Sequence, residues 1–198
     1  MTTRIITVAA AAAFAVSLAA CGSGGSGDDQ PATASIAEDP VPAGDAGGED
    51  TLALGGRAVS AFVDYGSEHT DPTKVGVRVV KVRKGRISDF KDFDLDAKQR
   101  RSVPYYVDAE FENLGHFALS RNLLQASVED GDGTEYRPLN LIVLSGTFRP
   151  CPEYSSAKLR PGDSFTGCSA ILLPKGAQLD RVRFQGDVTE DPVFWAPN

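Results

Sequence analysis

Histidine and cysteine are scarce in this chain of 198 residues, which holds two histidines and three cysteines. His69 lies in a polar stretch and His116 follows a turn signal, so both are expected at the surface. Nucleophilic catalysis needs a base positioned beside Ser, Thr or Cys, and no G-x-S-x-G motif occurs. Walker, dinucleotide-binding and zinc motifs are also missing, and no cofactor is expected. We predict a protein that is not an enzyme, with a hydrolase using two carboxylates as an alternative.

A hydrophobic run long enough to cross a bilayer is also missing. Residues 5–20 are uncharged but fall short of the ~20 residues that a span requires. A charge at Arg4 and small residues at the end of the run are typical of an export signal, predicted over residues 1–20. The run ends in Leu18, Ala19, Ala20 and Cys21.

These four residues resemble the bacterial lipobox, an aliphatic and two small residues before an obligatory cysteine. The resemblance implies that the thiol of Cys21 receives diacylglycerol and that the signal is cut just before it. Two acyl chains make a stable anchor, so the protein is expected at the outer face of the cell membrane. The alternative is a plain secretory signal with an incidental cysteine.

Basic residues are missing from residues 22–50, which carry seven acids among Gly, Ser, Ala, Thr and Pro. Such a segment buries too little apolar area to offset its ordering entropy, so residues 21–50 are predicted to be a disordered linker. The formal net charge of −7 therefore arises mainly in the linker, and residues 51–198 are nearly neutral. Binding to nucleic acid is not expected.

Helical periodicity is missing from residue 51 onward, where apolar and polar residues alternate. In "YYVDAEFEN", Val107, Ala109 and Phe111 share one face with Tyr105. In "VGVRVVKV" the alternation slips at Val80, which indicates a bulge or burial on both faces. Glycine- and proline-containing turns separate these segments at residues 113–115, 130–133, 161–162 and 174–176. The pattern predicts one antiparallel β-sandwich over residues 51–198.

The other two cysteines, Cys151 and Cys168, form an even pair once Cys21 carries lipid. Export places them where disulfides form, and we predict that they are bonded to each other. Closing this loop would raise the free energy of unfolding by ~3 kcal/mol. Free buried thiols or a bridge to a partner are the alternatives. A metal site is not predicted, because neither histidine lies near them in sequence.

A resemblance extends over residues 52–195 through several motifs in order. The valine-rich strand at residues 74–82 is followed by "VPYYVDAEFENLG", "VEDGDGTEY", "KLRPGDSFTGCSAILLPKG" and "LDRVRF". The series resembles a family of bacterial lipoproteins. Arginine is more frequent than lysine in the chain, which suggests an actinobacterial source. Their immunoglobulin-like domain is related in fold to the mycobacterial secreted immunoprotective antigen. The resemblance implies an immunoglobulin-like sandwich and supplies no catalytic residue.

Two kinds of charged stretch are candidate binding features. Asp92, Asp94 and Asp96 would share a face if extended, whereas the loop from Asp130 lacks the acids of an EF-hand. Solvated turns are the simpler interpretation, and a metal- or small-ligand-binding accessory protein is an alternative function. A basic candidate patch comprises Lys81, Arg83, Lys84, Arg86, Lys98, Arg100 and Arg101.

A solvated loop of mixed charge would explain this basic patch, and the functional interpretation is docking of an anionic envelope polymer or an acidic protein. The expected function is therefore binding or scaffolding in the cell envelope, with an unknown envelope protein or polymer as partner. The protein would be held at the membrane through the lipid on Cys21.

Overall fold

The computed structural model describes residues 51–69, 71–141, 147–152 and 157–197. All of them belong to the unit Val41–Asn198. The predicted signal, the lipobox Leu18, Ala19, Ala20 and Cys21, and the predicted linker lie outside the described residues.

The regular structure of the described residues is mainly β-strand, with three short 3-10 helices. The first strands are β1 (Thr51–Ala53), β2 (Arg57–Phe62), β3 (Thr73–Lys84), β4 (Val103–Asn113), β5 (Leu119–Ser120) and β6 (Ser127–Asp130). The later strands are β7 (Glu135–Tyr136), β8 (Lys158–Leu159), β9 (Ser164–Leu173), β10 (Leu179–Phe184) and β11 (Val193–Ala196). The 3-10 helices are η1 (Ile87–Phe90), η2 (Gln99–Arg101) and η3 (Arg121–Leu123).

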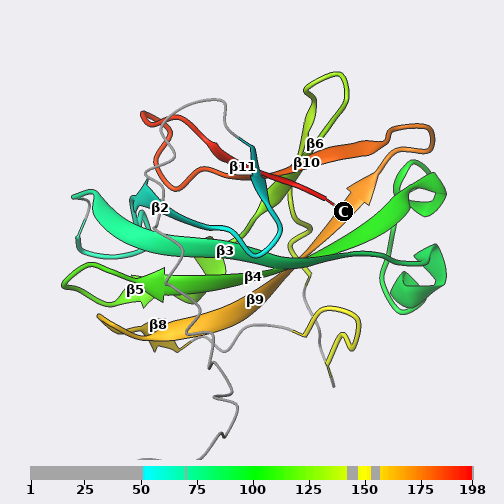
Figure 1. The fold of residues 1–198 in the computed structure, drawn as a ribbon. Helices are drawn as coiled ribbons and strands as arrows, with labels where there is room; N and C mark the ends of the chain where they lie inside the picture. The colour runs from blue at the N-terminus through cyan, green and yellow to red at the C-terminus, as the bar shows by residue number, and fades with distance from the viewer. Residues whose placement is uncertain (1–50, 70, 142–146, 153–156, 198) are drawn as a thin grey trace, which may run out of the picture. The chain divides into compact units, whose positions relative to one another are not determined.

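Two sheets form the two layers of the fold (Figure 1). One sheet has the strand order β1-β11-β10-β6-β7 and the other has the order β2-β3-β4-β9. The short strands β5 and β8 pair separately. A shared cluster of buried side chains joins the two sheets, so the predicted all-β sandwich is confirmed.

The pairing of β1 with β11 is parallel, whereas the other paired strands run antiparallel. This departs from a purely antiparallel sandwich, and its reason lies in the chain path. After β1 the turn at Gly55, with φ 85°, carries the chain into β2 of the other sheet. A parallel partner needs a long crossover, and here the crossover is nearly the whole domain.

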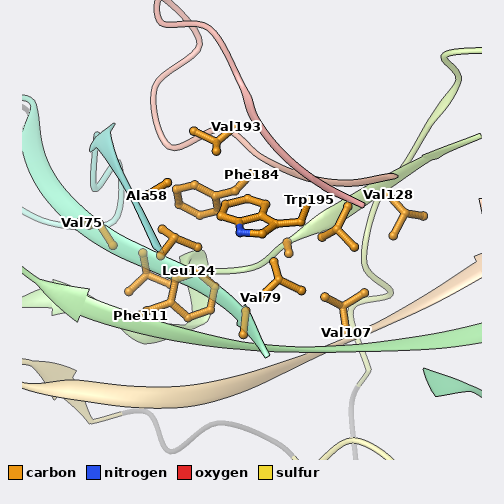
Figure 2. Close-up of a cluster of buried hydrophobic side chains, with 14 of the residues drawn as sticks. Ala58, Val75, Val79, Val107, Phe111, Leu124, Val128, Phe184, Val193 and Trp195 are labelled. Atoms are coloured by element: carbon orange, nitrogen blue, oxygen red, sulfur yellow. The ribbon is translucent and has the colours of Figure 1, made fainter. Parts of the chain in front are cut away.

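The alternation in the sequence places the core as predicted. Val107, Ala109 and Phe111 of β4 are buried between the sheets. Trp195 of β11 is fully buried, and Figure 2 shows its indole pointing into this cluster. The rings of Phe111 and Phe184 lie 5.6 Å apart and link the two sheets. Each sheet therefore contributes its apolar face to one core.

The predicted irregularity in β3 is a bulge. The register with β4 shifts between Val79 and Lys81, and Val80 is the extra residue, with 49% of its surface exposed. After the bulge, Val82 faces the core again, whereas Lys81 and Arg83 face outward. Burial on both faces does not explain the valine run, because the bulge restores the alternation after one exposed residue.

The predicted turns have two different physical causes. Gly133, Gly162 and Gly176 have φ between 76° and 100°, a region that favours glycine. Gly115 is required for a different reason, because a Cβ there would collide with the Thr73 side chain. The fully buried Asn113 fixes this turn by donating hydrogen bonds to the carbonyls of Phe117 and Leu159, at 2.8 and 2.9 Å.

A second, smaller hydrophobic cluster covers the outer face of the β4–β9 pair. Tyr106 and Ala170 from the strands pack with Phe90 of η1 and with Phe148. Cys151 and Cys168 form a disulfide with their Cα atoms 5.3 Å apart, so that prediction is confirmed. The disulfide attaches the segment that contains Phe148 directly to β9.

Candidate binding groove

Strand β9 is an edge of its sheet and forms the base of the candidate site (Figure 1). The Leu139 amide donates a hydrogen bond of 2.7 Å to the Ala170 carbonyl, on the side of β9 away from β4. Backbone groups alternate in direction along a strand, so Cys168 and Leu172 also direct backbone polar groups to this edge. Leu139 therefore covers the middle of the edge and leaves a hollow on each side.

The first hollow, which we call the carboxamide hollow, has a volume of about 260 Å³. Its described walls come from the η3 region, from the segment after β7, from the disulfide and from β9. Its lining residues are Asn122, Gln125, Pro138, Leu139, Asn140, Leu141, Cys151, Pro152, Cys168 and Ala170.

Three carboxamide side chains are the polar groups of this hollow. Asn122 and Asn140 are exposed and Gln125 is half-buried. Within the described ranges, none of the three side chains makes a hydrogen bond to protein, and the described lining carries no ionised side chain. Each carboxamide has a carbonyl acceptor and two N–H donors. The hollow thus offers donors and acceptors to a neutral, hydrogen-bonding group.

The second hollow, which we call the basic hollow, has a volume of about 410 Å³. Leu139 lines both hollows, so the two are adjacent and together form what we call the β9 groove. The basic hollow is lined by Lys98, Gln99, Ser102, Glu135, Tyr136, Arg137, Leu139, Leu172 and Pro174.

The single acid of the basic hollow's described lining is already paired. Glu135 forms ion pairs with Arg183 and Arg137, with N···O distances of 3.1 and 3.5 Å. The Arg137 side chain is 81% exposed, so it keeps most of its donors available to solvent. In the part of the chain that the structure describes, the Lys98 ammonium has no hydrogen-bond or ion-pair partner. The basic hollow therefore presents an excess of positive charge.

The disulfide wall of the carboxamide hollow is held by Arg83. Its guanidinium makes a forked pair with Asp108, at 2.9 and 3.0 Å, and donates to the Pro150 carbonyl at 2.9 Å. The hydrogen bond with Asp108 raises the pKa of Arg83 above its ordinary value. The same guanidinium lies over the Tyr106 ring, 5.2 Å from its centre.

Tyr106 extends this polar connection into the second hydrophobic cluster. Its hydroxyl donates a hydrogen bond of 2.9 Å to Asp89 of η1. Burial, and then this hydrogen bond, raise the pKa of Tyr106 well above its ordinary value. Arg83 and Tyr106 thus position the groove wall and remain in one charge state across the physiological range.

The residues of the predicted basic patch differ in their partners. Arg83 is committed to Asp108, whereas Arg100 and Arg101 donate to the carbonyls of Leu95 and Ala97 within their own loop. Lys81, Lys84 and Arg86 are exposed near the end of β3. Of the predicted patch, Lys98 alone lines the β9 groove.

The described residues give little support to the predicted alternatives of a metal site or a catalytic site. Asp94 is exposed and pairs with Arg100, whereas Asp96 accepts from the amides of Lys98 and Gln99. Across the described ranges, no group of three or more His, Cys, Asp or Glu side chains is arranged to hold a metal ion. The exposed His69 and His116 both contact the ring of Phe117, and neither lines the groove.

The carboxamides Asn122, Gln125 and Asn140, together with Arg137, were not predicted as site residues. They come from two segments, residues 122–125 and 137–140, and carry no local motif, so only the approach of these segments in the fold reveals them. Arg137 follows "DGTEY", where a basic residue after a predicted hairpin was the one available signal.

No protein-family model, curated protein or solved structure matches this chain. The described residues include no helix of the length and apolar character needed to cross a membrane.

Proposed function

We propose that this protein is an exported lipoprotein, anchored through diacylglycerol on Cys21, that binds an envelope polymer or protein through the β9 groove. The sequence "LAAC" at residues 18–21 supports the anchor, and the resemblance to actinobacterial lipoproteins supports the location. A lipid-anchored protein meets polymers and proteins of the envelope at close range. A non-catalytic binding domain fits this setting.

The observation that carries the proposal is the composition of the groove. Carboxamides without protein partners on one side of Leu139, and cations on the other, are groups available for recognition. Asn122 and Asn140 are exposed, so a ligand can reach their carboxamides, and ligand sites carry a few polar groups of this kind among apolar ones.

The same groove gives a catalytic role little support. The described basic hollow has two hydroxyl residues, and both are engaged: Ser102 donates to the Lys98 carbonyl at 3.1 Å and Tyr136 donates to Asp130 at 2.8 Å. Glu135 is held between two arginines, so it is poorly placed to act as a general base. A binding function, unlike catalysis, does not need a free nucleophile or a free base in the groove.

The proposal is tested by filling the groove. The full chain, purified from membranes in detergent, is mixed with the insoluble envelope fraction of the native cells and sedimented. Asn140→Trp places an indole at the rim of the carboxamide hollow, and Val188→Trp places one at a residue that is 75% exposed and outside the lining. Thermal unfolding checks that both variants fold.

We expect the wild type and Val188→Trp to sediment with the envelope fraction and Asn140→Trp to stay in the supernatant. Equal sedimentation of all three proteins would show that the groove is not the binding site. A wild type that remains in the supernatant would overturn the binding function itself.

A further inference from the structure

The two halves of the β9 groove differ in charge, and this difference defines the chemistry of a ligand that spans them. The described lining of the carboxamide hollow has no ionised group, whereas Lys98 and Arg137 line the basic hollow. Resting on the groove function proposed above, we propose that the ligand is an anionic polysaccharide. A sugar unit would occupy the carboxamide hollow, and a carboxylate or phosphate of the neighbouring unit would lie in the basic hollow.

The carboxamide hollow suits sugar hydroxyls. A hydroxyl both donates and accepts, and each of Asn122, Gln125 and Asn140 also does both. Aliphatic surface from Leu139 and Leu141 lies between these polar groups and can contact the C–H faces of a sugar ring. A neutral polyhydroxylated unit therefore matches this hollow better than an ionised or a wholly apolar one.

The basic hollow suits an anion. Hydrogen bonds from Lys or Arg to a carboxylate or phosphate are about twice as strong as neutral ones. Glu135 does not cancel the charge of both cations, because Arg183 also neutralises it from β10. The side chains are open to solvent, so salt screens the interaction and the affinity is expected to fall as ionic strength rises.

The edge of β9 argues against an extended peptide as the occupant. A peptide adds to a sheet by pairing with a row of free backbone groups. Here the Ala170 carbonyl, in the middle of this edge of β9, is buried and already accepts from the Leu139 amide. Two hollows on either side of a blocked position fit a chain of bulky units better than a continuous added strand.

The experiment uses end-labelled oligosaccharides and fluorescence anisotropy with the full chain in detergent. The probes are a hyaluronan oligosaccharide, in which a carboxylate-bearing sugar alternates with a neutral sugar, a neutral dextran oligosaccharide of equal length, and an oligoglutamate peptide of equal charge. The charge-reversal variant is Lys98→Glu/Arg137→Glu. Lys74→Glu/Arg160→Glu is the matched control, because both residues are exposed, lie outside the groove lining and change the net charge equally.

We expect the hyaluronan oligosaccharide to bind more tightly than dextran. Charge reversal in the groove should weaken its binding by about tenfold, while the control variant changes it little. Asn122→Ala/Asn140→Ala should weaken binding of the hyaluronan oligosaccharide and leave any residual oligoglutamate binding unchanged. Dextran that binds as tightly as the hyaluronan oligosaccharide would overturn the anion site. Oligoglutamate that binds equally well, and whose binding does not change in the asparagine variant, would assign the groove to an acidic protein instead.

The two assays together distinguish failure of the polysaccharide proposal from failure of the proposed groove function. If no oligosaccharide binds while the wild type still sediments with the envelope and Asn140→Trp does not, the polysaccharide assignment is wrong and the groove function stands. If neither assay detects groove-dependent binding, both proposals are wrong.

Discussion

The indole nitrogen of Trp195 donates a hydrogen bond of 2.9 Å to the carbonyl of Gly56, which lies 139 residues away in the chain. The bond connects the last strand, β11, to the turn between β1 and β2. Because Trp195 is fully buried, its ring packs in the core while its single polar group is satisfied at the edge of the core.

The first prediction concerns this residue. Trp195→Phe keeps an aromatic ring but leaves the Gly56 carbonyl without its donor, and we expect a loss of about 1–3 kcal/mol in the free energy of unfolding. Trp195→Ala also opens a cavity and should cost about 3–5 kcal/mol. Urea unfolding followed by circular dichroism measures both. Equal stability of Trp195→Phe and wild type would show that the hydrogen bond contributes nothing.

The second prediction concerns the disulfide. Cys151 and Cys168 are 17 residues apart, and closing such a loop lowers the entropy of the unfolded chain. The Cys151→Ser/Cys168→Ser double variant should lose about 3 kcal/mol in the free energy of unfolding. Reduction of the wild type with dithiothreitol should give a similar loss. A loss from substitution and none from reduction would attribute the effect to packing of the sulfur atoms.

The third prediction concerns acid stability at Asp130. Its carboxylate accepts hydrogen bonds from the Thr134 amide, the Tyr136 hydroxyl and the Asp132 amide, at 2.9, 2.8 and 3.1 Å. These bonds, the one from Thr134 foremost, hold the pKa of Asp130 below its ordinary value of 3.8. Since the folded pKa is the lower one, the carboxylate stabilises the fold above the ordinary value, and this stability is lost as pH falls through the folded pKa.

Asp130→Asn should therefore be less stable than wild type at neutral pH, and the difference should shrink as pH falls below about 4. Urea unfolding at a series of pH values measures this difference. Tyr136→Phe removes one of the three donors to the Asp130 carboxylate. Its loss of stability relative to wild type should also shrink as pH falls, but by less than the loss in Asp130→Asn. A difference between wild type and Asp130→Asn that stays constant across the series would contradict the assignment.

The fourth prediction concerns the anchor. Cys21→Ala removes the acceptor of the proposed lipid, and the protein should move from the membrane fraction to the medium. Fractionation and immunoblotting of the native host measure its distribution. Ser26→Ala serves as the control, because it is a substitution of similar size close to Cys21 that leaves the lipobox and the disulfide unchanged. Retention of Cys21→Ala in the membrane would overturn the anchor.

The sequence predicted the sandwich and its core because period-two alternation is a local signal. Phe111 and Val107 could be assigned to one face from their spacing alone, and the slip at Val80 indicated the bulge. The pairing of Cys151 with Cys168 followed from counting cysteines once Cys21 was set aside.

The groove could not be predicted in this way. Asn122 lies well before the segment that holds Arg137 and Asn140, and these residues line one groove only through the path of the loops around β9. The same reason hid the second cluster, in which Phe90 meets Phe148 with ring centres 4.9 Å apart. For the basic patch, the sequence shows the charges but not their partners, such as Asp108, which pairs with Arg83.

The parallel pairing of β1 with β11 has a mechanical consequence for a tethered protein. Any tension transmitted from an anchor at Cys21 enters the domain at Thr51, the first residue of an edge strand that pairs over three positions. Only three residue pairs hold this strand to β11, and its residues are exposed or half-buried, so it can separate at a lower free-energy cost than the core strands. Beyond it the pull reaches the Gly56 carbonyl and its bond to Trp195. If the proposed anchor holds at Cys21, β1 would yield before the core is strained.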